Sequence, residues 1–220
     1  MPMRFDVITI FPELFDSFLD TSIVKRAIAD KKIEVRFFNP RDKTTDKHNT
    51  VDDTPYGGGP GMVMKVEPIA KTIRSIRKKK RSRVILLSAK GKRFTQQKAK
   101  ILAKNYDQLI FVCGRYEGVD ERVLHYVDEE ISIGDYVMTG GEPGVMVIVD
   151  VVSRLVPGVL GAEASLDEES HGTPGYLEYP QYTRPEEYDG KKVPKILLSG
   201  DHGAIAEWRK KHSGEAQQQQ

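Results

Sequence analysis

The chain has 220 residues, of which 39% are hydrophobic and 30% charged, and its formal net charge is +2. This length and composition predict one or two soluble globular domains and exclude collagen-like, disordered and disulfide-stapled chains. No run approaches the roughly 18 apolar residues that a membrane span needs, and Asp6 and Pro12 interrupt what would be the apolar part of a signal sequence. We therefore expect a cytoplasmic protein. The single cysteine, Cys113, excludes an internal disulfide and a cysteine-based zinc site.

Four short apolar runs, rich in β-branched or aromatic residues, predict buried strands at residues 5–10, 34–38, 84–88 and 109–113. Apolar residues at helical spacing lie between them, over residues 12–29, 65–78 and 95–105. Pro12 suits a first helical turn, and Thr95 suits an N-cap. Strands that alternate with helices predict an α/β fold with a mostly parallel sheet.

The later part of the chain gives weaker signals. Residues 143–158 contain the Val and Ile typical of a strand, but their length, Pro143 and the Pro157-Gly158 end favour a buried helix, which is our interpretation. After Gly161 the sequence is rich in Pro, Gly, Tyr and acids without an apolar period, which predicts a long loop. A short helix is expected over 203–212, and residues 214–220 read as a disordered end.

Positive charge is concentrated in one stretch. Between Lys71 and Lys104 there are fourteen Lys or Arg residues and no Asp or Glu. Such a stretch favours binding of a polyanion such as nucleic acid, because each phosphate that it neutralises releases condensed counterions. A solvated helix end and loop would explain the charges equally well. The stretch makes nucleic acid a candidate ligand.

Three glycine-rich segments stand next to strand-like runs: residues 54–62, 113–123 and 132–144. Glycine lets the backbone turn sharply and approach a ligand, so such turns at strand ends are where α/β proteins build nucleotide pockets. None of the three has the GxxxxGK[ST] or GxGxxG pattern, which disfavours phosphate hydrolysis and hydride transfer. Taken singly, each is more often a plain turn than a ligand site.

In combination the motifs are far more specific. PYGGGPGM (55–62), CGRYEGVDER (113–122), IGDYVMTGGE (133–142) and SRLVPGVLG (153–161), in this order and spacing, closely resemble the bacterial tRNA (guanine-N1)-methyltransferases of the SPOUT superfamily. The similarity runs from about Phe5 to Trp208 and includes FPELF, NPRD, HNTVDD, YTRPEEY and VPKILLSGDH.

The resemblance implies an α/β fold whose mostly parallel sheet has flanking helices and a C-terminal trefoil knot. It implies a knotted cofactor-binding domain at 1–160, a mobile linker and active-site loop at 161–178, and a short C-terminal tRNA-binding region at 179–220. It also implies a homodimer whose active site is completed across a twofold interface.

The same resemblance places S-adenosylmethionine in the knot. The cofactor-binding residues that it implies are Leu87, Ser88, Ala89, Gly91, Gly114, Tyr116, Glu117, Ile133, Gly134, Asp135, Tyr136, Val137, Met138, Gly140 and Gly141. No metal-ligand spacing is legible among the histidines, although the family associates a magnesium ion with methyl transfer.

The implied substrate is tRNA, methylated at N1 of the guanosine 3′ of the anticodon, position 37. Arg154 would hold the charge that develops on O6, and Glu169, which stands where the family usually has Asp, would remove the N1 proton. Asp167 is the alternative base. Tyr56, Gly58, Gly59 and Ser170 are expected to contact the substrate, with turn packing as an equal alternative for Tyr56.

The sequence departs from the family pattern at several positions, of which Glu169 and the short C-terminus keep a non-catalytic function open. Ala89 replaces a common proline, Pro143-Gly144 replaces Leu-Pro, and the chain ends soon after residue 212, where the family usually continues into a helical domain. The basic stretch could compensate in gripping tRNA. The alternatives are a related SPOUT methyltransferase with another target and a non-catalytic RNA-binding relative.

Overall fold

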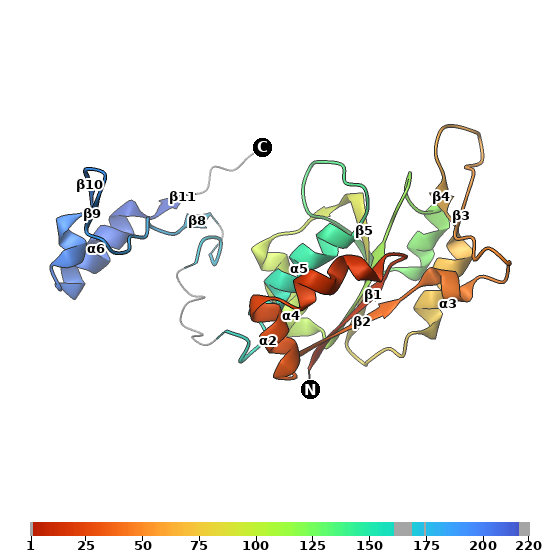
Figure 1. Ribbon diagram of the computed structural model, residues 1–220, viewed down its shortest axis with the longest axis horizontal. Coiled ribbons are helices and arrows are strands. Elements are labelled where there is room, and N and C mark those ends of the chain that lie inside the picture. The colour runs from red at the N-terminus through yellow and green to blue at the C-terminus, as the bar shows by residue number, and fades with distance from the viewer. Residues whose placement is uncertain (1, 161–168, 174, 216–220) are drawn as a thin grey trace. The chain divides into compact units, whose positions relative to one another are not determined.

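The computed structural model describes residues 2–160, 169–173 and 175–215 (Figure 1). The chain divides into two compact units, Met1–Gly161 and Ala162–Gln220, each described by itself. None of the described helices is long and apolar enough to cross a membrane.

The first unit is built on one parallel sheet. Its five strands are β1 (Met3–Ile8), β2 (Ile33–Phe38), β5 (Ser82–Arg93), β6 (Gln108–Cys113) and β7 (Glu129–Ser132), in the order β2-β1-β6-β5-β7. Every pairing between them is parallel, which confirms the predicted fold class. Four strands match the apolar runs, because strands buried on both faces are continuously apolar. Strand β7 was missed, since Glu129 and Glu130 open it.

Helices cover both faces of the sheet. Helices α2 (Ser22–Ala29), α4 (Gln96–Asn105) and α5 (Glu142–Arg154) pack on one face and share a core cluster that includes Phe5, Phe111 and Ile148. Helix α3 (Val66–Ser75) packs on the other face with Ile69 and Ile73. The helical interpretation of 143–158 is confirmed, and Thr95 caps α4 by accepting a hydrogen bond from the Lys98 amide at 3.2 Å.

The single helix predicted over 12–29 is wrong in one respect, because it is broken. A 3₁₀ turn at Pro12–Phe15 leads into α1 (Asp16–Leu19), and α2 starts afresh at Ser22. The Thr21 hydroxyl donates to the Ser17 carbonyl at 2.5 Å, and Ser22 has a φ of 54°. A side chain that satisfies the last carbonyls in this way competes with continuation of the helix. Apolar residues on both sides of the break, such as Phe15 and Ala27, still pack in the core, whereas Leu14 is exposed.

The second unit has little regular structure, as its composition predicts. Strand β8 (Tyr176–Leu177) pairs with β11 (Gly214–Glu215), and β9 (Glu187–Tyr188) pairs with β10 (Lys191–Lys192). Helix α6 (His202–His212) matches the predicted helix and is capped by Asp201, which accepts from the Ala204 amide at 3.0 Å. The expected disorder at 214–220 is corrected at its start, because backbone pairing with β8 makes Gly214 and Glu215 a strand.

Candidate functional site

The three glycine-rich segments meet at the carboxyl ends of the central strands. Two short antiparallel strands, β3 (Asp52–Asp53) and β4 (Val63–Met64), flank the first segment, and the Glu117 amide donates to the Met62 carbonyl at 3.0 Å. The Gly141 amide donates to the Gly114 carbonyl at 3.0 Å, so the segments after β6 and β7 are joined directly. In open α/β sheets this edge is where ligands bind.

A cavity of about 270 Å³ lies between these loops. It is bordered by the middle of β5, where the pairing with β7 shifts register between Leu87 and Lys92, by the segment after β6 and by the segment after β7. Thirteen of the fifteen residues predicted to bind the cofactor line it: Leu87, Ser88, Ala89, Gly114, Tyr116, Glu117, Ile133, Gly134, Tyr136, Val137, Met138, Gly140 and Gly141. The motifs are separated by tens of residues in sequence, and the parallel sheet brings them to one place.

Gly91 and Asp135 do not line the cavity. Gly91 lies within β5 against β7, where a Cβ atom would come within 2.6 Å of the Ile131 backbone. Glycine is therefore required for close pairing of the two strands. Asp135 forms an ion pair with Arg93 at 2.6 Å on the surface. Their positions assign both residues to the frame around the cavity.

The cavity wall carries charges of both signs. Glu117, Glu121 and Glu130 contribute carboxylates, and Lys90 and Arg115 contribute cations. The apolar part of the wall comes from leucine, isoleucine, valine and methionine side chains. Such a lining accommodates a ligand that combines an apolar ring with charged groups.

A buried ion pair lies beside this cavity and was missed by the sequence analysis. Glu142 is fully buried at the start of α5, and its Oε2 lies 2.9 Å from Nε of Arg115, although the N–H does not point along this line. The other carboxylate oxygen accepts from the Thr9 hydroxyl at 2.6 Å, and the guanidinium lies 4.7 Å from the Phe11 ring centre. Both residues stand in motifs that the sequence analysis singled out, Arg115 in GRYEG and Glu142 in GGE. The sequence does not show that these two side chains pair.

This ion pair explains why residue 140 is glycine. Arg115 and Gly140 form an isolated antiparallel bridge, and a Cβ on Gly140 would lie 2.3 Å from the Arg115 Nε and 2.6 Å from the Glu142 Oε2. Any side chain there would displace the pair. Cys113 is buried next to them as expected; burial and the nearby Glu142 charge raise the pKa of its thiol well above the ordinary value, so the thiol stays protonated.

The predicted substrate residues at 56–59 lie on an exposed loop. Tyr56 is fully exposed and does not line the cavity, and Gly58 and Gly59 both have positive φ angles with open space around them. The base of this loop reaches the cavity, since a Cβ on Gly61 would lie 2.5 Å from the Glu117 side chain. The loop thus presents an exposed aromatic ring from a base anchored to the cavity wall.

The predicted catalytic pair is divided between the two units. Arg154 is the last residue of α5 and is half-buried in the first unit. Glu169 and Ser170 belong to a turn in the second unit, in which the Gly172 amide donates to the Glu169 carbonyl at 2.9 Å. The Ser170 hydroxyl accepts from the Glu178 amide at 2.9 Å, which fixes the turn against β8. Asp167, the alternative base, lies outside the described residues.

The basic stretch does not form one surface. The Lys79 ammonium donates to the Pro2 carbonyl at 2.9 Å, and Arg81 pairs with Asp107 at the amino-terminal ends of β5 and β6. Because the strands are parallel, this end of the sheet is opposite the cavity. Only the later part, around Lys90, reaches the cavity wall. Lys79 and Arg81 therefore hold strand ends together, far from the predicted methyl-transfer site.

Comparison with known proteins gives a consistent result. The sequence profile of the family described as tRNA (Guanine-1)-methyltransferase TrmD matches residues 3–220. A tRNA (guanine-N(1)-)-methyltransferase of Dictyoglomus turgidum is 58% identical over 211 residues, which cover 96% of this chain and 85% of that protein. Proteins of the same name from Clostridium botulinum and Nostoc punctiforme are 54% and 51% identical over 96% and 94% of this chain and 87% of each relative. The chain, with these loops gathered at one edge of a parallel sheet, belongs to the TrmD family of tRNA (guanine-1)-methyltransferases.

Proposed function

We propose that this protein transfers a methyl group from S-adenosylmethionine to N1 of the guanosine at position 37 of tRNA, directly 3′ of the anticodon. The observation that carries the proposal is the cavity at the carboxyl ends of β5, β6 and β7, in a chain that belongs to this family. Three loops that the family resemblance assigns to the cofactor form its wall. A trefoil knot made by these loops is part of the proposal.

The chemistry of the cavity wall fits the cofactor. S-adenosylmethionine combines an adenine ring with a positively charged sulfonium and an amino group. The apolar side chains of Leu87, Ile133 and Met138 would receive the ring, and the carboxylates of Glu117 and Glu130 favour the positive groups. Bound there, the cofactor supplies a methyl group on a sulfur that becomes a neutral thioether once the methyl has left.

The protein's own residues make N1 of guanine nucleophilic. N1 carries a proton, and its lone pair becomes available for the methyl group as that proton moves to the Glu169 carboxylate. Negative charge then develops on O6, where the Arg154 guanidinium stabilises it, since this cation cannot lose its own proton in a protein. The target base has to leave its stack in the anticodon loop to reach this site.

The homodimer is part of the proposal, since the family resemblance implies an active site completed across a twofold interface. In a twofold assembly each interface presents the same surface twice, so each subunit would contribute one residue to each of two equal sites. Within the described ranges, no group of three or more His, Cys, Asp or Glu side chains is placed to hold a metal ion. Mg²⁺ is usually held by one or two carboxylates together with waters and substrate oxygens, so a chelator titration of methyl transfer tests the family's association with this ion.

The decisive experiment is transfer of labelled methyl groups from S-adenosylmethionine to unmodified tRNA, with the product base identified by nuclease digestion and mass spectrometry. We expect N1-methylguanosine at position 37. Glu169→Gln should lower the rate by about 10²–10⁴, as expected for loss of a general base. Glu169→Asp restores the family's usual residue and should remain active. Glu207→Gln, an exposed acid on α6, is the matched control and should leave the rate unchanged.

Each other outcome has a definite meaning. Product that survives Glu169→Gln moves the base to Asp167 or elsewhere. Methylation of another position identifies a SPOUT methyltransferase with a different target. Cofactor binding with no transfer from the parent chain would identify a non-catalytic RNA-binding relative.

A further inference from the structure

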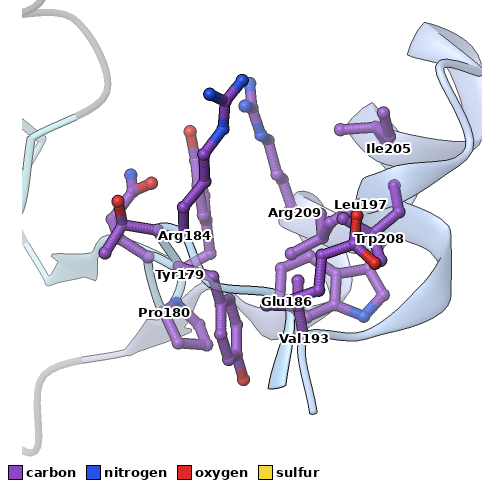
Figure 2. A pocket seen from close by; sticks show the side chains of 13 residues that line it. Tyr179, Pro180, Arg184, Glu186, Val193, Leu197, Ile205, Trp208 and Arg209 are labelled. Atoms are coloured by element: carbon purple, nitrogen blue, oxygen red, sulfur yellow. The ribbon is translucent and has the colours of Figure 1, made fainter. Parts of the chain in front are cut away.

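The charge that a cavity accepts depends on whether the cationic side chains in its wall are compensated. In the second unit, Arg184 and Arg209 border a cavity of about 400 Å³, and Figure 2 shows both side chains pointing away from Trp208. Within the described ranges, no carboxylate lies within 4.0 Å of either guanidinium group, so this cavity favours anions. The cavity at the carboxyl ends of the strands in the first unit has a different arrangement.

In the first unit, each cation of the cavity wall has an acidic partner. The Nζ atom of Lys90 lies 3.7 Å from Oε2 of Glu121, and both side chains line the cavity. The Nε atom of Arg115 lies 2.9 Å from Oε2 of Glu142, which is fully buried and does not line the cavity. The positive charge of the wall is therefore cancelled partly from within the protein.

The remaining charge of the wall is negative. Glu117 and Glu130 line the cavity, and in the described part of the chain neither carboxylate has a cationic nitrogen within 4.0 Å. Since both cations of the wall are paired, these two carboxylates set the sign of the potential, which favours a positively charged ligand. Loss of the charge on Glu142 would let the Arg115 guanidinium offset one of them.

Arg115 carries a fixed charge that needs such a partner. Its guanidinium lies 4.7 Å from the Phe11 ring centre, and its Nη1 donates to the Thr139 carbonyl at 3.4 Å. The side chain is 15% exposed and cannot lose its proton in a protein, so only an acid can cancel its field. The Thr9 hydroxyl holds Glu142 in place for this, because it donates to the other carboxylate oxygen at 2.6 Å.

We propose that Glu142 determines specificity for the charged form of the cofactor. By cancelling the charge of Arg115, it lets the cavity prefer S-adenosylmethionine to S-adenosylhomocysteine, the thioether that remains after methyl transfer. This inference rests on the proposed function, which supplies the cofactor. The two molecules share the adenosine and amino-acid groups and differ by a methyl group and the positive charge on sulfur. A preference based on that charge favours exchange of the spent molecule for a new methyl donor.

The experiment measures the Kd of each molecule by titration calorimetry on the full-length protein, without tRNA. The relevant quantity is the Kd of S-adenosylhomocysteine divided by that of S-adenosylmethionine, because a variant that only loosens the cavity changes both in proportion. Glu142→Gln keeps an oxygen that accepts from Thr9 and removes the charge. It should lower the ratio by about 5- to 20-fold, as expected of one uncompensated charge near the ligand. Arg115→Met/Glu142→Gln leaves no charge uncompensated and should restore the parental ratio.

A second variant tests the same charge balance without disturbing the buried pair. Glu130→Gln removes an unpaired carboxylate of the wall and should also lower the ratio. The matched control is Glu67→Gln on α3. It too leaves a cation without its acid, since Glu67 pairs with Lys71 at 2.7 Å, but both residues lie outside the cavity wall. The control should change the ratio by less than about twofold.

The proposal is overturned if Glu142→Gln changes both dissociation constants in proportion, which is the result of a purely structural role. It is also overturned if Glu67→Gln lowers the ratio as much, or if the double variant keeps the lowered ratio. Circular dichroism checks that each variant is folded. If Glu142→Gln does not fold, an unchanged ratio in Glu130→Gln overturns the proposal instead.

Failure of this inference can be told apart from failure of the proposed function. If the parent protein methylates guanosine 37 and the ratio does not depend on Glu142, only the charge discrimination is wrong. If the ratio responds as expected but no methyl group reaches guanosine 37, the role of Glu142 stands and the proposed target is wrong. If the parent protein binds neither molecule, both proposals fail.

Discussion

The carboxylate of Glu142 has partners from two separate segments of the chain, and it directly follows the turn that borders the cavity at the carboxyl ends of the strands. Thr9 follows β1, Arg115 follows β6, and the absence of a side chain at Gly140 leaves room for Arg115 and Glu142. A buried charge is costly unless it is paired, so these contacts fix the end of the sheet in one arrangement. The shape of the cavity thus depends on Thr9 and Glu142, which do not line it, as well as on the residues of its wall.

At this scale we predict that Arg115→Met destabilises the protein by about 3–5 kcal/mol, because it leaves the Glu142 charge buried without a cation. The double variant Arg115→Met/Glu142→Gln should recover part of this loss, since the amide still accepts from Thr9. Urea unfolding of both variants measures the difference. Arg122→Met is the control, because Arg122 and Asp120 pair at the surface and their pair contributes about 0–1 kcal/mol. Additive losses in the double variant would contradict the prediction.

At the scale of the elements, β7 is held partly by ion pairs. Its Glu129 side chain, 15% exposed, pairs with Arg83 of β5 at 3.0 Å and with Lys98 of α4. Burial alone raises the pKa of Glu129, but the hydrogen bonds from Lys98 and Arg83 outweigh it and lower the pKa below the usual 4.5. The short acidic strand β7 is thereby held at the edge of the sheet by a cationic side chain from β5 and another from α4.

A carboxyl group whose pKa is lowered by folding stabilises the protein above the unfolded pKa, and this stability is lost as the pH falls through the folded value. Glu129→Gln should therefore cost about 1–3 kcal/mol at pH 7. The difference from the parent should shrink as the pH falls below about 4.5. Denaturant titrations at pH 7 and pH 3.5 measure it, with Glu130→Gln as the control on the same strand. A difference that does not change with pH would exclude the ion pairs as its cause.

The elements also show how much of the fold can be predicted from the sequence. Both faces of this sheet are covered by helices, so a strand within it is buried on both sides. An unbroken run of apolar residues, such as 109–113, therefore predicts such a strand. This rule fails for β7, where ion pairs replace apolar contacts. Helical periodicity likewise fails over 12–29, because it predicts one continuous helix where the Thr21 side chain ends a helical turn. The meeting of the glycine-rich segments follows from strand order, which neighbouring residues do not encode. The roles of Arg154 and Glu169 came from family resemblance, since local spacing cannot place two distant side chains together.

On the scale of the whole molecule, Arg154 and Glu169, the two residues proposed to be catalytic, belong to different units of the chain. If each site combines Arg154 of one subunit with Glu169 of the other, two inactive variants can rescue each other. Dimers that pair an Arg154→Ala subunit with a Glu169→Gln subunit contain one intact site and one doubly altered site.

Co-expression of the two variants should therefore restore methyl transfer to roughly a quarter of the parental rate, because about half of randomly formed dimers are mixed and each has one active site. The assay is the same methyl transfer to tRNA. Each variant carries a different purification tag, so that mixed dimers can be identified. Light scattering after size-exclusion chromatography should give the mass of a dimer. No recovery in mixed dimers would place both residues of a site in one chain.

The strand order also bears on how the chain acquires its structure. Strand β1 stands between β2 and β6, and its pairing partners in β6, such as Gln108 for Arg4, lie about a hundred residues later. Pairings this distant in sequence slow folding, because loop-closure entropy is lost before the contacts that offset it form. At a synthesis rate of about 5–20 residues per second, one edge of β1 waits several seconds on the ribosome for β6. During those seconds the unpaired edge is open to pairing with other chains, which makes the nascent chain prone to aggregation.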